Sequence, residues 1–127
     1  MKQTVNQRKL GEAKEDLAIT FLKQKGCEIL DRNFYIRGGE IDIIGKENGC
    51  IFFIEVKYRK SELYGGAVSA ISPQKQRRIA KTALHYIAKK GIPMDYPFRF
   101  DVILINNNKL TWLKNAFEFP ADPGFLL

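Results

Sequence analysis

Apolar residues recur at helical spacing near the start of the chain. Over residues 7–25 they fall every third or fourth position, and Gly26 follows as a stop signal. At about 100° per residue, Glu12 and Asp16 lie opposite this stripe, whereas Glu15 lies at its edge. The pattern predicts an amphipathic helix with Glu15 along the boundary of the core. The stripe consists of Leu10, Ala13, Leu17, Ala18, Phe21 and Leu22.

Three segments typical of strands follow this helix. Residues 27–36 predict one bent strand or two short ones, and residues 41–44 predict a second strand. Residues 46–49 end in Asn-Gly, which favours a tight hairpin turn. Residues 51–58 are apolar on both alternating faces, so we expect a central strand covered on both sides. One of these faces carries Ile51, Phe53, Glu55 and Lys57, and the other carries Phe52, Ile54, Val56 and Tyr58.

The second half of the chain predicts one more helix and two more strands. Ser72 is suited to cap a helix and Pro73 to begin it, and the helix should end near Lys90. Residues 98–105 and 110–113 predict a closing hairpin. The apolar stripe expected for the helix is Ile79, Ala80, Ala83, Leu84 and Ile87.

The order of these elements, α-β-β-β-α-β-β, predicts an α/β fold with a central mixed sheet flanked by helices. A chain of 127 residues is the size of one domain with one substantial core. We therefore expect a single domain over residues 1–127, with its core at about residues 8–114 and a C-terminal extension at 115–127.

The positive charge of the chain is concentrated in one segment. The formal net charge is +7, and residues 56–94 hold nine Lys or Arg and one acid, Glu62, whereas the remainder holds twelve basic and thirteen acidic residues. A localised positive field suits a polyanion, nucleic acid first and an anionic membrane surface second, and a merely solvated basic face is the alternative. The predicted nucleic-acid-binding residues are Arg59, Lys60, Lys75, Arg77, Arg78 and Lys81, with Tyr58 and Tyr64 nearby.

Composition excludes several other classes of function. The longest apolar run, residues 51–54, is too short to span a bilayer, and the N-terminus has no apolar signal-peptide core, so we expect a cytoplasmic protein that does not enter membranes. No amphipathic helix with large exposed apolar residues supports binding to a membrane surface. Cys27 and Cys50 lack metal-binding spacing, and His85 has no partner in sequence, so we expect two small buried thiols and no zinc site.

Three charged residues interrupt the apolar strands GEIDII and FFIEVK. Asp42 and Glu55 lie on strands joined by a short turn, so their side chains can converge at one end of the sheet, and Lys57 projects from the same face as Glu55. Two neighbouring carboxylates repel each other unless one is protonated or a cation lies between them. Oxygen ligands of this kind suit Mg²⁺ or Mn²⁺. An inert cluster of ion pairs, Glu55 with Lys57 or Asp42 with Lys57, is the structural alternative.

These residues match the needs of phosphodiester hydrolysis. A metal ion held by Asp42 and Glu55 could polarise the phosphate and lower the pKa of a bound water. Lys57 could orient that water or stabilise the charge that develops on the phosphate, and Glu15 could add an acid beside the metal. The spacing D-x12-E-x-K is common by chance, so its placement within apolar strands carries the argument.

Several motifs, taken in order over residues 8–105, resemble the YraN family of predicted endonucleases. That family is similar to archaeal Holliday-junction resolvases within the restriction-endonuclease-like (D-x-E-x-K) superfamily. One departure is Lys14, which occupies a position where the family usually has Gly. The matching motifs are G-x-x-x-E-x-x-A (Gly11, Glu15, Ala18), Arg32-Asn33, GEID, FIEVKYR, the helix start around Lys75, and RFDV at residues 99–102.

The resemblance implies a restriction-endonuclease-like core and an Mg²⁺- or Mn²⁺-dependent endonuclease that hydrolyses phosphodiester bonds. The nucleic acid implied is DNA rather than RNA, and it includes branched or structured DNA. It implies Asp42 and Glu55 as metal ligands, with the backbone carbonyl of Val56 completing the metal shell. Lys57 is implied as the catalytic lysine and Glu15 as an accessory acid. The alternative is a non-catalytic module that binds nucleic acid with the same fold.

Two further acids match family positions, and for both we predict structural roles. Glu40 belongs to the GEID motif, and Asp101 should pair with Arg99 or Lys57 at a strand end. Resolvases act as dimers because a four-way junction has two strands to cut, so a homodimer is a further expectation.

Overall fold

The computed structural model describes residues 2–59, 71–107 and 109–121. Within these ranges the order of elements is the one predicted, and no helix is both long and apolar enough to cross a membrane. Lys60 and Tyr64 lie outside the described residues. The elements are α1 (Lys2–Gln24), β1 (Glu28–Ile36), β2 (Gly39–Glu47), β3 (Cys50–Tyr58), α2 (Pro73–Lys89), β4 (Phe98–Asn106) and β5 (Lys109–Phe117).

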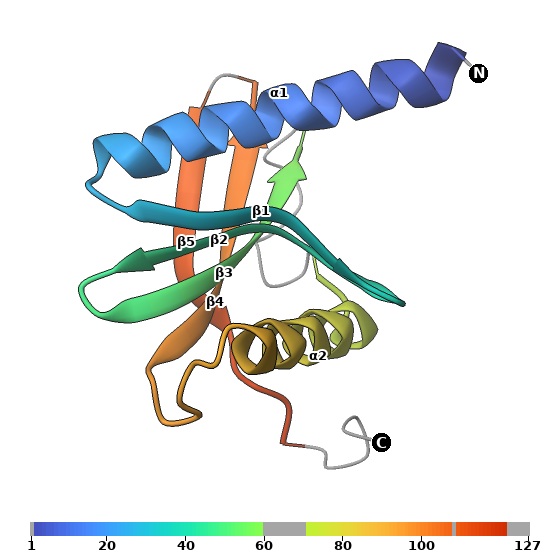
Figure 1. The fold of residues 1–127 in the computed structure, drawn as a ribbon. Helices are drawn as coiled ribbons and strands as arrows, with labels where there is room; N and C mark the ends of the chain where they lie inside the picture. The colour runs from blue at the N-terminus through green and yellow to red at the C-terminus, as the bar shows by residue number, and fades with distance from the viewer. Residues whose placement is uncertain (1, 60–70, 108, 122–127) are drawn as a thin grey trace.

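The strands form one mixed sheet in the order β1-β2-β3-β4-β5, which places β3 in the centre as predicted. Neighbours are antiparallel except β3 and β4, which are parallel. Parallel neighbours need a crossover connection, and α2 lies within it. Helices α1 and α2 cover opposite faces of the sheet (Figure 1). The predicted single α/β domain with a mixed sheet between two helices is confirmed.

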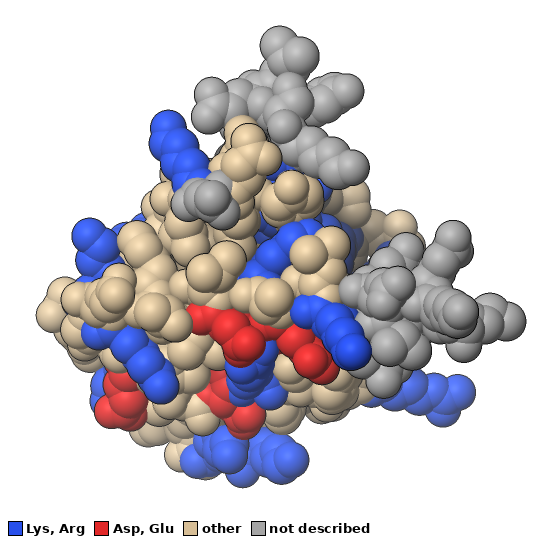
Figure 2. Space-filling view, turned by 90° about the horizontal axis from the view of Figure 1, so that it is seen from above, with Lys and Arg blue, Asp and Glu red and all other residues tan. Residues whose placement is uncertain are grey.

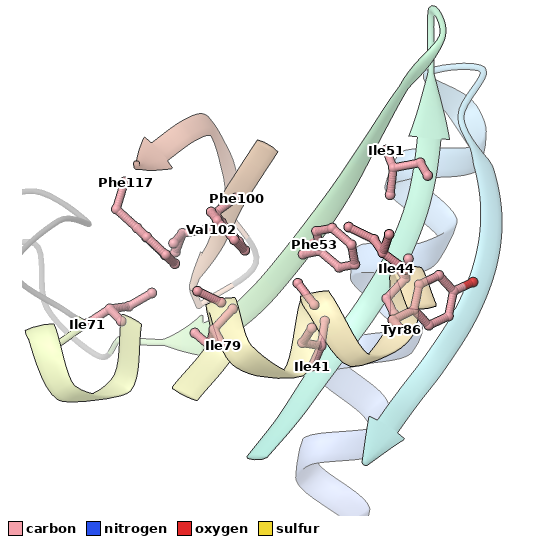
Figure 3. Close-up of a cluster of buried hydrophobic side chains, with 13 residues drawn as sticks. Ile41, Ile44, Ile51, Phe53, Ile71, Ile79, Tyr86, Phe100, Val102 and Phe117 are labelled. Atoms are coloured by element: carbon pink, nitrogen blue, oxygen red, sulfur yellow. The ribbon is translucent and has the colours of Figure 1, made fainter. Parts of the chain in front are cut away.

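Strand β3 contributes to a hydrophobic core on each face, as its alternating pattern predicts. Ile51 and Phe53 pack on the α2 side with Tyr86 and Phe100, shown in Figure 3. Phe52 and Ile54 pack on the α1 side. Burying a phenylalanine side chain stabilises the folded state by about 1.5–3 kcal/mol. Phe52 and Phe53 are both completely buried or nearly so, so the centre of β3 is a rigid base for the charged residues that follow it.

The hairpin between β2 and β3 is tighter than predicted. Glu47 pairs with Cys50, so the turn consists of Asn48 and Gly49 rather than residues 46–49. Both turn residues have positive φ, 50° and 73°, which is the backbone of a type I′ turn. This turn matches the twist of the flanking strands and fixes their register. The register in turn determines where Asp42 lies relative to β3.

Helix α1 is rotated about its axis relative to the prediction. Leu10 and Leu17 are each 54% exposed, whereas Ala18 and Leu22 are completely buried. The inward face therefore follows Ala18 and Leu22, and Glu15 lies on it, with a side chain only 14% exposed. Glu15 and Lys14 are accommodated there because Glu15 pairs with Arg32 and the Lys14 ammonium lies 3.7 Å from the centre of the Tyr58 ring.

Smaller differences affect α2, β5 and the cysteines. Ser72 caps α2 as predicted, its hydroxyl accepting a hydrogen bond from the Lys75 amide at 3.1 Å. Leu84 is only half-buried, and Tyr86 is buried instead because it packs against Phe53. Strand β5 continues to Phe117, whose ring stacks on Phe100. Both cysteines are free thiols; Cys27 is buried, but Cys50 is half-buried because it borders the exposed turn.

Candidate active site

Strands β2 and β3 separate at the position of Asp42. Their pairing begins at the turn and ends with Ile43 opposite Ile54. Beyond that pair, the backbone N–H of Val56 donates a hydrogen bond to Oδ2 of Asp42, at 2.8 Å. The carboxylate therefore takes the place of a strand acceptor at the fork, which holds it beside the segment containing Glu55 and Lys57. Asp42 therefore lies beside the end of β3, as the sequence predicts.

Four carboxylates from α1, β2 and β3 influence one another at this fork. Burial, followed by the charge of Glu55, raises the pKa of Asp42 to about 7, and the Val56 N–H opposes this effect. The charges of Glu15 and Glu40 also raise the pKa of Asp42. Negative charge is therefore concentrated where burial makes it unfavourable. We call Glu15, Glu40, Asp42 and Glu55 the acidic cluster.

Glu40 is a member of this cluster that the sequence does not identify. Burial raises the pKa of Glu40, the charges of Glu15 and Glu55 raise it further, and Lys75 lowers it. The sequence predicts a structural role for Glu40, but its position beside three other acids makes it part of the candidate site. Its spacing of two from Asp42 along β2 is the signal that could have revealed it.

Two lysines contact the most deeply buried member of the acidic cluster. The Glu55 side chain is 7% exposed, and its Oε1 lies 3.0 Å from Nζ of Lys75 and 3.5 Å from Nζ of Lys57. Burial lowers the pKa of Lys75, but the charge and hydrogen bond of Glu55 outweigh it, so the pKa is raised. The sequence places Lys75 on a basic helix edge. The structure places its ammonium group within the candidate site as well.

Arg32 connects Glu15 to the sheet. Its Nε lies 3.3 Å from Oε1 of Glu15, its Nη1 lies 2.6 Å from Oδ1 of Asp16, and its Nη2 donates to the Glu12 carbonyl at 3.1 Å. These contacts tie α1 to β1 and orient Glu15 toward the fork. The sequence marks Arg32-Asn33 as a motif without a role, and the structure gives Arg32 a positioning role.

Among the other predicted nucleic-acid-binding residues that the structure describes, Arg78 lines a hollow together with Lys75 and Glu40. Arg59 is half-buried and donates to the Tyr58 carbonyl at 3.1 Å. Arg77, Arg78 and Lys81 are exposed on α2. Figure 2, seen from the α1 side, shows acidic side chains gathered near the middle of this face with Lys and Arg side chains around them.

Asp101 belongs to a separate cluster on the opposite face of the sheet. Its carboxylate accepts hydrogen bonds from Nε of Arg99 at 3.0 and 3.1 Å, from Nε1 of Trp112 at 2.9 Å and from the Asn115 amide at 2.8 Å. Arg99 also pairs with Glu47 at 2.6 Å, and these acids raise its pKa. The predicted structural role of Asp101 agrees with this geometry, and its partner is Arg99 rather than Lys57.

A hard cation at the fork would be held by few protein ligands. Across residues 2–59, 71–107 and 109–121, no group of three or more His, Cys, Asp or Glu is arranged to hold a metal ion. Mg²⁺, however, usually keeps several waters and binds through one or two carboxylates. The oxygens of Asp42 and Glu55 fit that requirement, and a cation beside them would relieve the repulsion that raises the pKa of Asp42.

The model of a protein family, described as Uncharacterised protein family UPF0102, matches residues 14–105. The chain belongs to the UPF0102 family. The matched residues include every member of the acidic cluster and both lysines, and they end within β4. UPF0102 is the YraN family that the sequence motifs resemble, so the predicted family is confirmed.

Several UPF0102 proteins from bacteria are similar over most of their length. One from Janthinobacterium sp. (strain Marseille) is 41% identical over 108 residues, which cover 85% of this chain and 86% of the relative. One from Legionella pneumophila (strain Corby) is 42% identical over 110 residues, covering 85% and 93%. One from Lachnoclostridium phytofermentans is 42% identical over 114 residues, covering 90% and 97%.

Proposed function

We propose that this UPF0102 protein is an Mg²⁺- or Mn²⁺-dependent endonuclease that hydrolyses phosphodiester bonds in DNA, including branched or structured DNA. The observation that carries the proposal is the fork between β2 and β3. There, Asp42 lies beside Glu55, and the repulsion between neighbouring carboxylates that raises the pKa of Asp42 would be relieved by a bound cation. Lys57 and Lys75 both contact Glu55. A structural ion pair needs neither the additional acids nor the second lysine.

Each residue of the site has a role in this proposal. Asp42 and Glu55 would hold the metal ion together with the Val56 carbonyl, and the ion would supply a polarised phosphate and a more acidic water. Lys57 and Lys75 place two ammonium groups beside Glu55, where they can contact phosphate oxygens and stabilise the charge that develops on them. Glu15, oriented by Arg32, is an accessory acid.

We also propose the wider context that the resemblance implies. The whole chain acts as one nuclease-like domain in the cytoplasm, and a homodimer would present two sites to a branched substrate. Arg77, Arg78 and Lys81, which are exposed on α2, would contact the phosphate backbone together with Arg59 and Lys60. The nucleic acid proposed is DNA rather than RNA.

A second candidate function is binding of nucleic acid without cleavage. The observation that favours it is the pairing of Glu55 with two lysines, which already compensates its charge in the absence of a metal ion. In that case the acidic cluster would only hold the fork together, and the basic residues of α2 would supply the affinity.

The decisive experiment is a cleavage assay with labelled linear, flap and four-way-junction DNA in Mg²⁺ and in Mn²⁺. The parent protein should cut at least one substrate, and Asp42→Asn and Lys57→Ala should not. Lys23→Ala, which removes an exposed lysine from the last turn of α1, is the matched control. Equal cleavage by the parent and both site variants would refute the nuclease. Binding without cleavage by any variant would establish the second candidate.

A further inference from the structure

An exposed aromatic side chain lies beside the acidic cluster. Tyr35 is 66% exposed on β1, which is an edge strand of the sheet, and it pairs in register with Glu40 on β2. Large aromatic side chains are usually buried, because their burial contributes strongly to stability. An exposed ring next to a candidate site is therefore a feature to explain by binding rather than by packing.

Two hollows of opposite character meet at Tyr35 and Glu40. The first, of about 500 Å³, is rich in oxygen acceptors and is lined by Gly11, Glu12, Glu15, Asn33, Tyr35 and Glu40. The second, of about 310 Å³, contains two cationic side chains and is lined by Tyr35, Gly38, Gly39, Lys75, Arg78 and Ile79 together with Glu40. Tyr35 and Glu40 thus line both an acidic hollow and a basic one.

The local backbone creates this arrangement. Gly38 has φ +87° in the turn between β1 and β2, a conformation that favours glycine. A Cβ atom on Gly39 would collide with the Thr82 hydroxyl of α2, so glycine allows the end of the hairpin to approach the helix. This approach brings Tyr35 beside Lys75 and Arg78. On the other side, Asn33 adopts a left-handed conformation, φ 53°, and borders the acidic hollow.

A nucleotide has parts that match the basic hollow, the Tyr35 ring and the acidic hollow. Its phosphate suits the basic hollow, where Lys75 links it to the proposed cleavage site, and is repelled from the acidic hollow. Its base can stack on the Tyr35 ring, and base edges that carry N–H donors suit the carboxylates and amide of the acidic hollow. Bases within a duplex are already stacked and paired, so this arrangement requires an unpaired nucleotide.

We propose that Tyr35 stacks on an unpaired DNA base beside the phosphate that enters the site. The substrate class is then DNA with an unpaired nucleotide next to the cut, such as a flap or a single-stranded overhang. This inference rests on the proposed function, since the basic hollow would bind a phosphate that is cut at the adjacent site. Tyr35 is in this view a residue that selects substrate structure.

The test is a binding measurement in EDTA, which does not require cleavage. Fluorescence anisotropy with labelled single-stranded, flap and fully paired DNA compares the parent with Tyr35→Ala and Tyr35→Trp. Tyr35→Ala should weaken binding to single-stranded and flap DNA about 5- to 150-fold, the effect of losing one base–aromatic stack. Tyr35→Trp should keep the affinity, and paired DNA should bind both variants like the parent. Met94→Ala, which truncates a side chain 68% exposed after α2, is the control.

The salt dependence provides a second criterion. Because a stack involves no phosphate contact, the slope of log affinity against log salt should be the same in Tyr35→Ala and the parent. Equal binding of single-stranded DNA by Tyr35→Ala and the parent would overturn the inference. An equal loss on paired DNA would also overturn it, since the ring would then act on the backbone or on the fold.

The two proposals can fail separately. If the parent cuts no DNA but Tyr35→Ala loses affinity for unpaired DNA alone, the stack stands and the endonuclease falls. If the parent cuts DNA and Tyr35→Ala binds and cuts flaps normally, the endonuclease stands and the stack falls. A parent protein that binds none of the three DNAs would overturn both.

Discussion

Two aspartates, Asp101 and the half-buried Asp42, lie in opposite surroundings. Asp101 is surrounded by donors, the Arg99 guanidinium, the Trp112 indole and the Asn115 amide, and its side chain is completely buried. Asp42 accepts a hydrogen bond from Val56, but its other neighbours include Glu55, Glu15 and Glu40, which raise its pKa. A carboxylate with satisfied partners stabilises a fold. One surrounded by other acids needs a proton or a cation, and this difference separates a structural cluster from a candidate site.

The largest expected effect is on catalysis. Asp42→Asn keeps the size of the side chain but removes a proposed metal ligand, so cleavage should fall by about 10³-fold or more. The measurement is single-turnover cleavage of the best substrate in Mg²⁺, with far-ultraviolet circular dichroism to verify folding. Retention of more than about a tenth of the parent rate would remove Asp42 from the active site.

The next largest effect is on stability, where Asp101 should matter more than Asp42. Asp101→Ala removes one of the two carboxylates paired with Arg99 and leaves the Trp112 indole and the Asn115 amide without their acceptor, so the free energy of unfolding should fall by about 3–5 kcal/mol. Asp42→Asn removes a carboxylate that repels its neighbours, and should be neutral or stabilising. Urea unfolding of both variants in EDTA measures the difference. If Asp42→Asn were the more destabilising change, Asp42 would be the structural aspartate and the acidic cluster would not be a site that needs a proton or a cation.

A smaller effect concerns pH. Burial raises the pKa of Asp42 to about 7, above its value of about 3.9 in an unfolded chain. Between these values the folded protein binds more protons than the unfolded chain, so the free energy of unfolding should decrease as pH rises from about 4 to 7. The decrease should be about 2–4 kcal/mol, and Asp42→Asn should flatten this part of the profile. Urea unfolding in EDTA across this range provides the test, and parallel profiles for the parent and Asp42→Asn would contradict it.

The smallest effects are expected at the contact between α1 and β1. Asp16 is 65% exposed, so Asp16→Ala should change the free energy of unfolding by less than about 0.5 kcal/mol. Glu15→Gln should be similarly mild in stability but should reduce cleavage about tenfold, because Glu15 faces the fork. Measuring urea unfolding and cleavage for both variants separates the two neighbouring acids. Equal cleavage rates for the two would make Glu15 another surface acid.

The strands were predictable because their signals are local. Alternation along residues 51–58, the Asn-Gly turn and the apolar context of Asp42 and Glu55 are all contained in short segments, and they determine the β2–β3 hairpin. The convergence of Asp42 and Glu55 follows from that hairpin. Periodicity also places Glu15 close to the buried side of its helix.

The contributions of the helices were harder to predict, because they depend on contacts between distant segments. For α1, the apolar residues Leu10 and Leu17 suggest one inward face, but Ala18 and Leu22 pack against the sheet, and the pairing of Glu15 with Arg32 accommodates an acid on that face. For α2, the sequence gives a basic edge without indicating that Lys75 reaches Glu55 across the structure. The sequence predicts only a structural role for Glu40 for the same reason, since three of its charged neighbours come from other elements.

A cation site at the β2–β3 fork can be tested by titrating the protein with Mn²⁺ and following free Mn²⁺ by electron paramagnetic resonance. The parent and Lys23→Ala should bind Mn²⁺, Mg²⁺ should compete for the same site, and Asp42→Asn and Glu55→Gln should lose Mn²⁺ binding. Unchanged Mn²⁺ binding in both site variants, or no binding by the parent at millimolar Mn²⁺, would contradict the assignment of the β2–β3 fork as a cation site.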